Sequence, residues 1–330
     1  NEVVDPGKKS LVRDQTGTSS DSIPVRLKVL LLTLYTGWNL GDGAIQDAAI
    51  HHLRKRFSSP QIQLVTLSPG ATTKLHGLPS FPLTRDEWDH QAALERSGSP
   101  NEHGNSRTDA SFSPKLKKRL KHVSWLYPFL VRTYRPIRSL IKTLKAGSRE
   151  MRHLFNAYQL LKKTNLLVIS GGGQIDDYWG GAFGHPYALA KWSSLAKLAG
   201  VPVVFLSVGV CSLKSRLSRK FALRALRIAT YRSYRDAGSK ELLGDANFTH
   251  ADPVYPDLAF SHPRAGQLNL GNPNRDKSHL IVGVSPITYL SPHGWPEQDA
   301  GVYERYLQML CEFTIQVLVA GHTVILFTSA

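Results

Sequence analysis

The sequence predicts an α/β fold in which parallel strands alternate with helices. Short, nearly continuous apolar runs recur along the chain, a pattern typical of strands buried on both faces of a parallel sheet. Segments with helical spacing separate these runs, which indicates βαβ connections. Glycine-rich turns follow several of the runs. The 330 residues are enough for about two domains.

A polar leader rich in Pro, Gly and Ser is expected to be disordered at residues 1–24, and the first domain is expected over residues 25–262. Residues 69–108 have the polar composition of a loop. The expected elements of this domain are strands at 27–35, 61–67, 165–170, 201–207 and 230–234, helices at 44–57, 186–199 and 215–229, a short helix from residue 239, and a last segment at 248–251.

A linker rich in Pro, Gly and Asn is expected at residues 263–277, followed by a second domain at 278–330. This domain begins with an apolar strand, continues with a helix at 300–320 and reaches another strand at 323–328. A single βαβ step cannot cover both faces of a parallel sheet. We therefore expect the second domain to be incomplete in this chain.

Most of the net charge of +16 belongs to one segment. Residues 115–163 contain 14 Lys and Arg against one acid, Glu150. Aromatic and Leu side chains alternate with these bases, and we expect a basic helical insertion at about 109–163. Such a segment suits peripheral contact with an anionic membrane. The alternative is a solvated basic helix pair that packs on the domain by its apolar side. No nucleic-acid-binding module accompanies the charge, so nucleic acid is not an expected partner.

Other features exclude several classes of protein. No apolar stretch has the length of a membrane span, and a secretory signal is not expected. The expected location is cytoplasmic. Cys211 and Cys311, expected to be buried thiols, cannot form a disulfide framework. No constellation of metal ligands is visible, so no metal site is predicted.

The turn after the first strand contains Asn39, Gly41 and Asp42. Ligands of parallel α/β sheets bind beyond the carboxyl ends of the strands, where glycines allow close approach. The spacing is not G-x-G-x-x-G, which disfavours a nicotinamide-dependent dehydrogenase. The alternative is a tight turn in which Asn39 and Asp42 only cap the following helix.

A glycine triplet, Gly171–Gly173, follows a middle strand. Three glycines carry a cost of roughly 0.5–1 kcal/mol each relative to Ala, so something requires this backbone freedom. Close approach of a ligand is one such requirement, and a crowded crossing from strand to helix is another. Gln174, Asp176 and His185 follow and supply polar and acid–base groups. A lone His in such a place is often structural.

Two later strand ends carry further candidate binding residues. Gly209 lies near the end of the strand at 201–207, and Arg235, Asp236 and Ser239 follow the strand at 230–234. An Arg at a strand end can bind a carboxylate or phosphate through two hydrogen bonds. The alternative is that Asp236 and Ser239 cap the next helix while Arg235 pairs with a neighbouring acid. Asp257 places a carboxylate near the expected end of the domain.

Taken in order, these segments resemble the polysaccharide pyruvyl transferase family. The family has an N-x-G-D turn, a glycine triplet, an R-D-x-x-S-x-x-x-L segment and a D-x-A-F element. The matching residues here are Asn39, Gly41 and Asp42; Gly171–Gly173; Arg235, Asp236, Ser239 and Leu243; and Asp257, Ala259 and Phe260. The resemblance implies a GT-B-like arrangement of two Rossmann-like domains facing a cleft. The family's Arg–His element in the C-terminal domain has no match before Ala330.

The resemblance implies a bacterial transferase that moves the enolpyruvyl group of phosphoenolpyruvate onto a sugar as a ketal. The acceptor would be a lipid-linked or polymeric glycan of an exopolysaccharide or cell wall, and no cofactor would be needed. Arg235 is then expected to hold the donor, with backbone N–H groups of Gly171–Gly173. Asp42 or Asp176 is the expected base, and His185 the expected acid.

Two alternatives to a pyruvyl transferase stay open at this point. One is a GT-B glycosyltransferase that uses a nucleotide sugar, which would need a nucleotide pocket in the second domain. The other is a non-catalytic, membrane-associated scaffold that binds glycans. A scaffold would tolerate the loss of Arg235 and Asp42.

Overall fold

The computed structural model describes residues 26–37, 39–85, 147–211, 213–244, 248, 251–265, 278–292, 295 and 298–328. The expected leader at 1–24, residues 109–146 of the expected insertion and residues 266–277 of the expected linker lie outside these ranges. The expected domain boundaries therefore stay predictions.

The larger part of the described chain is built on a parallel sheet, with β1 in its interior. The strands are β1 (Lys28–Leu32), β2 (Gln61–Thr66), β3 (Ser80–Pro82), β4 (Leu166–Ile169), β5 (Gly172–Ile175), β6 (Val203–Val210) and β7 (Tyr231–Tyr234). Their order is β3-β2-β1-β4-β6, with β5 and β7 also paired to β6, and every pairing is parallel. The chain steps outward from β1 on one side and returns to its other side with β4. This is the Rossmann-like topology, and it confirms the predicted α/β fold class.

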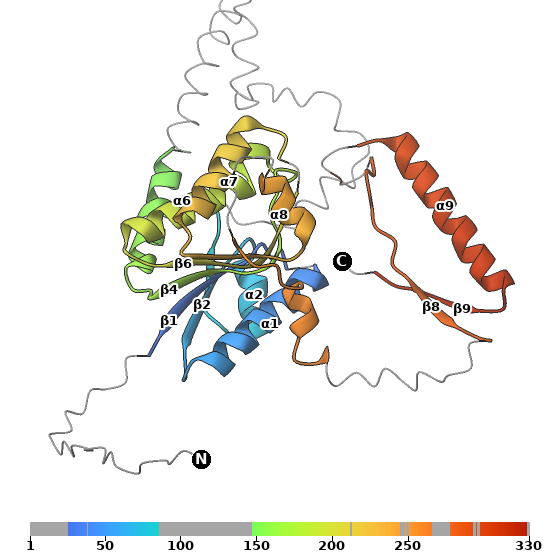
Figure 1. The fold of residues 1–330 in the computed structure, drawn as a ribbon, viewed down its shortest axis with the longest axis horizontal. Helices are drawn as coiled ribbons and strands as arrows, with labels where there is room; N and C mark the ends of the chain where they lie inside the picture. Colours follow the sequence, from blue (N-terminus) through green and yellow to red (C-terminus); the bar gives the residue numbers. More distant parts are fainter. Residues whose placement is uncertain are drawn as a thin grey trace, which may run out of the picture.

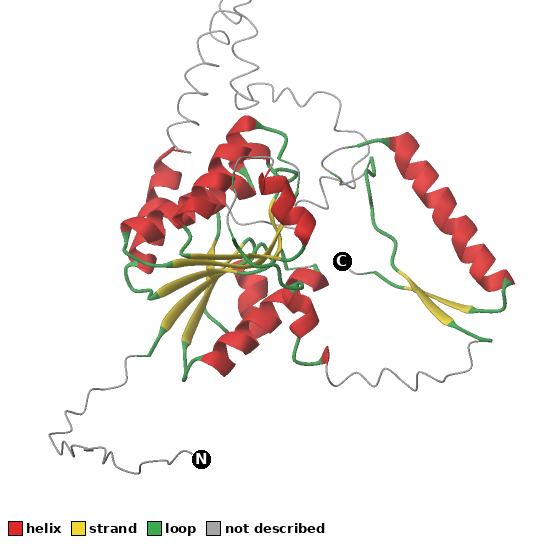
Figure 2. Cartoon of the chain, in the orientation of Figure 1, coloured by secondary structure: helices red, strands yellow, loops and turns green. Residues whose placement is uncertain are grey.

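Helices cover both faces of this sheet (Figures 1 and 2). On one face lie α1 (Leu40–Arg56) and α2 (Pro69–His76), and on the other lie α6 (His185–Leu198), α7 (Arg216–Ile228) and the helical residues 147–161. The remaining helices are α8 (Ala237–Gly244) and the short 3-10 helices η1 (Gly181–Phe183) and η2 (Leu258–Ser261). β1, β4 and β6 are largely buried from both sides, which is why their sequences read as apolar runs.

The hydrophobic core between the sheet and α6 is tied to the chain on both sides of residues 86–146. Trp192 on α6 is fully buried, and its indole N–H donates to the Leu83 carbonyl (2.9 Å). The His153 Nε2 atom lies 3.0 Å from the Pro82 carbonyl oxygen. Residues 82–83 and residue 153 therefore meet beside α6, although 70 residues separate them in sequence.

A buried ion pair joins α6 to the helical residues 147–161. The Lys191 ammonium group lies 3.2 Å from the Glu150 carboxylate, with only 2% of the Lys191 side chain exposed. The Tyr187 hydroxyl donates to the same carboxylate oxygen (3.0 Å). Burial lowers the pKa of Lys191, and burial together with the hydrogen bond to Glu150 raises the pKa of Tyr187 to about 12.

One local expectation was wrong. Residues 69–82 are not all loop, because α2 begins at Pro69 and ends before Gly77 (φ +64°), and β3 then pairs with β2. The glycine triplet leads into β5, and β6 pairs with β4 from Val203 to Phe205 and in the same register with β5 at Val208; the register shifts only between Gly172 and Ile175. Residues 248 and 251 lie in no helix or strand, and Val254 makes a parallel bridge to Tyr234.

A second, smaller unit consists of β8 (Ile281–Val284), α9 (Ala300–Val319) and β9 (Thr323–Leu326). Its two strands are parallel, as the predicted βαβ step requires. No residue of α9 is buried, and Cys311 on this helix is exposed rather than buried as expected. Cys211 is half-buried. Among the described helices, none combines the length and the apolar character needed to cross a bilayer.

Candidate active site

The candidate residues gather at the carboxyl edge of the sheet, where the strand order reverses between β1 and β4. From β1 the chain enters α1 on one face, and from β4 it continues through β5 toward α6 on the other face. Neighbouring loops diverge at such a point and leave a crevice between them. The turn at residues 39–42 and the residues after β5 lie at this point of the sheet.

The turn before α1 fixes the position of Asp42. The Asn39 side-chain oxygen accepts the Asp42 backbone N–H (3.1 Å) and so caps α1. A side-chain carbon on Gly41 would lie 3.1 Å from this same oxygen. Asn39 and Gly41 therefore shape the turn, as the structural alternative for this motif predicted.

Asp42 itself has an unusual electrostatic environment. Burial raises the pKa of this carboxyl from 3.8 to about 6; His185 and Arg235 oppose the rise, whereas Asp257 and Asp176 add to it. The four predicted side chains from three later segments thus act on one carboxyl group. A carboxyl with a pKa near neutrality can exchange protons with a substrate at physiological pH.

The glycine triplet brings the β4–β5 backbone against Asp42 and β6. A side-chain carbon on Gly171 would lie 2.8 Å from the Ser207 carbonyl oxygen. Gly172 has a φ of +93°, and a carbon added there would lie 3.5 Å from the Asp42 carboxylate. An added carbon on Gly173 would meet nothing within 4 Å. Packing explains the first two glycines, and the third faces open space.

Gln174 holds this backbone from within. Its side-chain N–H donates to the Gly171 carbonyl (2.9 Å), and its side-chain oxygen is buried without a hydrogen-bond partner. Gln174 is only 2% exposed. Its side chain therefore supports the backbone of the triplet.

Asp176 and His185 form a hydrogen-bonded pair. The His185 Nδ1 atom lies 3.1 Å from one Asp176 carboxylate oxygen, and the other oxygen accepts the Tyr178 backbone N–H (3.0 Å). His185 is the first residue of α6, and its Nε2 atom is the ring nitrogen not engaged by Asp176. The structure thus brings all three predicted catalytic residues, Asp42, Asp176 and His185, to one place.

Asp177, the neighbour of Asp176, serves the fold instead. One of its carboxylate oxygens accepts the backbone N–H groups of Lys214 and Ser215 (3.0 and 3.1 Å). Burial alone would raise the pKa of Asp177, but hydrogen bonds from Ser218, Ser215 and Lys214 outweigh it and lower the pKa.

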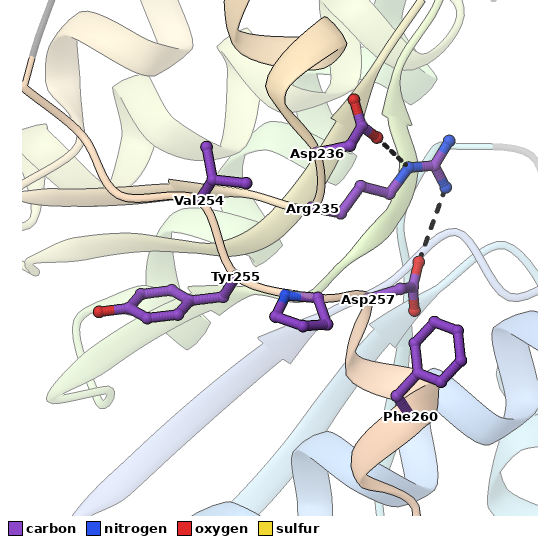
Figure 3. A pocket seen from close by; sticks show the side chains of 7 residues that line it. Arg235, Asp236, Val254, Tyr255, Asp257 and Phe260 are labelled. Carbon is purple, nitrogen blue, oxygen red and sulfur yellow. Dashed lines mark hydrogen bonds and ion pairs between the residues drawn. The ribbon is translucent and has the colours of Figure 1, made fainter.

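Arg235 lies between two carboxylates (Figure 3). Its Nε atom is 3.2 Å from Asp236 and its Nη1 atom is 3.6 Å from Asp257. Asp236 also accepts the Ser239 backbone N–H (2.6 Å), and the Ser239 hydroxyl accepts the Val210 N–H (3.0 Å). Asp236 and Ser239 thus cap α8 and join it to β6, as the structural alternative predicted.

Two open pockets flank the Arg235 side chain, with volumes of about 520 and 500 Å³. Both are lined by Arg235 and Asp236, and both fall within the size range of small-molecule sites. The larger is also lined by Val254, Tyr255, Pro256, Asp257 and Phe260. We did not predict Val254, Tyr255 or Pro256, and only their proximity to Asp257 in sequence could have indicated them.

A further cluster, not predicted from the sequence, holds the segment that carries Asp257. Asp47 on α1 lies 3.3 Å from His76 Nδ1 and 3.4 Å from His262 Nε2. His262 directly follows η2, so this contact anchors η2 against α1. Within the described part of the chain, no group of three His, Cys, Asp or Glu side chains could hold a metal ion.

Comparisons with known proteins add a family to this geometry. The model of the family described as "Polysaccharide pyruvyl transferase" matches residues 39–313. A search of curated protein sequences gave no significant match.

Among solved structures, the chain is similar to the UDP-GlcNAc 2-epimerase of Methanocaldococcus jannaschii, with 9% identity and a TM-score of 0.43, over 91% of this chain and 65% of that one. It is also similar to the UDP-N-acetylglucosamine 2-epimerase of Rickettsia bellii, with 8% identity and a TM-score of 0.35, over 92% of this chain and 62% of that one. The chain thus spans less than two thirds of the length of either epimerase. Such scores carry no functional information, whereas the family match covers most of the chain. The chain belongs to the polysaccharide pyruvyl transferase family.

Proposed function

We propose that this protein transfers the enolpyruvyl group of phosphoenolpyruvate to a glycan as a pyruvate ketal. The observation that supports this most is the convergence of Asp42, Asp176, His185 and Arg235 at one edge of the sheet. The donor carries a phosphate and a carboxylate, and Arg235 offers a guanidinium group between two open pockets. The glycan would be a lipid-linked or polymeric acceptor for an exopolysaccharide or cell wall, and no cofactor is required.

The reaction needs one acid and one base. Protonation of the methylene carbon turns it into a methyl group and leaves positive charge on the central carbon. An acceptor hydroxyl attacks that carbon and gives up its proton, phosphate leaves, and a second hydroxyl closes the ketal while its proton goes to phosphate. The donor and a diol thereby become a ketal and inorganic phosphate, with all atoms balanced.

The residues can be assigned to these steps as follows. Asp42, with its pKa raised to about 6 mainly by burial, accepts the proton of the first hydroxyl. The His185 Nε2 atom donates the proton to the methylene carbon, and Asp176 orients the ring through Nδ1. Arg235 binds the anionic end of the donor and stabilises the negative charge that develops there. The backbone N–H groups of Gly171–Gly173 are proposed to assist Arg235.

Peripheral contact with an anionic membrane through residues 115–163 is part of the same proposal, and so is a cytoplasmic location at the inner face of the plasma membrane. Acceptors built on lipid carriers would then reach the site from that surface. Most of this segment lies outside the described residues, so only the charge pattern in the sequence supports this step.

The test is thermal stabilisation of the protein by phosphoenolpyruvate and by a panel of nucleotide sugars. A ligand at ~100 times its dissociation constant stabilises a protein by about 2.7 kcal/mol. Phosphoenolpyruvate is expected to shift the melting temperature of the parent and of Arg54→Ala, an exposed arginine on α1, but not that of Arg235→Ala. A shift by a nucleotide sugar alone would indicate a glycosyltransferase, and no shift by either ligand would indicate a scaffold. Release of phosphate with a glycan acceptor would then identify the acceptor.

A further inference from the structure

The helices on one face of the main sheet carry a strongly asymmetric charge. We define the basic face as α6, α7 and the helical residues 147–161, with the adjoining residues 162–163 and 214. It has eleven exposed bases and one acid, Glu150, which is paired with Lys191. The exposed bases are Arg149, Arg152, Lys162, Lys163, Lys197, Lys214, Arg216, Arg219, Lys220, Arg224 and Arg227.

The opposite face of the sheet lacks this asymmetry. There α1 and α2 together carry four bases and two acids. The two sets of helices cover the same sheet (Figure 1). The excess of positive charge therefore belongs to one surface of this sheet and is not spread evenly over both. Charge of one sign on one face attracts a partner with a dense array of the opposite charge.

Helix α7 shows the pattern most clearly. Its inner side is buried through Ala222, Leu223, Ala225 and Leu226, and its outer side carries five bases and no acid. Two of these bases, Arg216 and Arg219, lie near the helix N-terminus, where the helix dipole disfavours positive charge. These two bases therefore do not serve the stability of the helix itself.

Large apolar side chains project among these bases. The exposed fractions are 70% for Phe183, 70% for Leu198, 65% for Met151 and 61% for Phe155. The Phe183 ring packs against Tyr187 of α6 and Phe221 of α7, with ring centroids 6.0 and 6.1 Å away, so it is held at the base-rich part of α7. Bases attract any polyanion, but exposed apolar side chains beside them also favour an acyl boundary.

We propose that the basic face docks on an anionic lipid bilayer, with the bases at the headgroups and Phe183 at the acyl boundary. This proposal rests on the membrane contact included in the proposed function and assigns that contact to a surface separate from the candidate active site, so it does not depend on the proposed chemistry. Because α7 follows β6, the base-rich end of this helix lies at the same edge of the sheet as the candidate active site. Docking would bring that edge close to the bilayer.

The test compares two triple variants of the full chain that lose the same charge. Arg216→Gln, Arg219→Gln and Lys220→Gln neutralise the start of α7, and Arg54→Gln, Lys55→Gln and Arg56→Gln neutralise the end of α1 on the other face. Binding is measured by flotation with phosphatidylglycerol–phosphatidylcholine vesicles and with phosphatidylcholine vesicles. One base near an anionic surface contributes about fivefold, so the α7 variant should bind anionic vesicles about 100-fold more weakly and the α1 variant within about threefold of the parent.

A further variant separates the lipid from other polyanions. Phe183→Ser should weaken binding to anionic vesicles without removing a charge, and this loss should persist in high salt, which screens the contribution of the bases. Equal losses in the two triple variants, or undiminished binding by the α7 variant, would overturn the proposal. So would binding to heparin or DNA that the α7 substitutions abolish while vesicle binding stays intact. Melting temperatures check that every variant is folded.

Discussion

The guanidinium group of Arg235 fills the space in which residue 209 would carry its first side-chain carbon. A carbon added to Gly209 would lie 2.5 Å from the Arg235 Nε atom and 2.6 Å from its Cζ atom. Gly209 belongs to β6 and Arg235 follows β7, the strand that pairs with β6. Because Gly209 has no side chain, the guanidinium group of Arg235, the proposed donor-binding group, can occupy this space beside β6.

Gly209→Ala is expected to displace Arg235 while leaving the fold intact. The clash is with the far end of a flexible side chain, and Gly209 does not have a positive φ. The free energy of unfolding should change by less than about 1 kcal/mol. The affinity for phosphoenolpyruvate should fall at least about tenfold, because a bidentate contact depends on geometry. Titration of both variants with the donor measures this, with Gly70→Ala on α2 as the control because an added carbon there meets nothing within 4 Å.

Asp42→Asn is expected to abolish transfer and yet stabilise the protein above pH 6. The folded pKa is raised from 3.8 to about 6, so the folded state holds this proton more tightly than the unfolded state. The contribution of Asp42 to stability is therefore fully present below about pH 4 and is lost as the pH rises through about 6, by at most about 3 kcal/mol. Asparagine remains neutral and avoids that loss.

Urea unfolding of the parent and Asp42→Asn at pH 4 and pH 8 measures this effect. The two proteins should differ little at the lower pH, and the variant should be more stable by about 1–3 kcal/mol at the higher one. Glu304→Gln, which removes an exposed carboxylate on α9, is the control. A difference independent of pH would show that Asp42 does not titrate as assigned. In the parent, the rate of transfer should also fall as the pH drops below about 6, because the base becomes protonated.

Asp176 and Asp177 should respond differently to replacement by alanine. Asp177→Ala removes the acceptor of two backbone N–H groups and should cost about 1–3 kcal/mol of stability. Because the folded pKa of Asp177 is lowered, its contribution is present above the ordinary pKa near 3.8 and is lost as the pH falls through the folded pKa. Asp176→Ala should lower kcat by at least about 100-fold with a smaller change in stability. Equal loss of stability in the two variants would contradict these roles.

Replacement of Glu150 and replacement of Lys191, the partners of the buried ion pair, should cost unequal amounts of stability. Glu150→Ala leaves the Lys191 ammonium buried without its counter-ion and should destabilise the protein by about 3–5 kcal/mol. Lys191→Met keeps an apolar side chain in the same space and leaves Glu150 with the Tyr187 hydroxyl, so its cost should be below about 1.5 kcal/mol. Chemical denaturation of both variants and of the double variant gives the coupling between them. A larger cost for Lys191→Met would show that the pair itself stabilises the fold.

The strands that the sequence predicted best are those buried on both faces. The runs at 27–35 and 165–170 contain β1 and β4, because a parallel strand covered by helices has no polar face to interrupt its pattern. β3 was missed because it has three residues and depends on pairing with β2, a contact that local sequence does not encode.

Prediction of the site was also limited by contacts that the local sequence does not encode. Because the carboxyl ends of parallel strands share one edge, the sequence could predict that Asp42, Asp176 and Arg235 would gather there. It could not predict that Asp177 would turn away toward Ser215, since two adjacent aspartates look alike without the loop that receives one of them. The fit of Arg235 over Gly209 depends on the register of β6 and β7.

The contacts of His153 with Pro82 and of Trp192 with Leu83 have a consequence for how members of this family can diverge. Residues 82–83 and residue 153 meet at one place, and both are held against α6. Insertions or deletions between them need not alter any strand or move His185. Exchange of residues 86–146 between homologues should therefore yield folded chimaeras, which makes this stretch a natural place for evolution to vary while the chemistry stays constant.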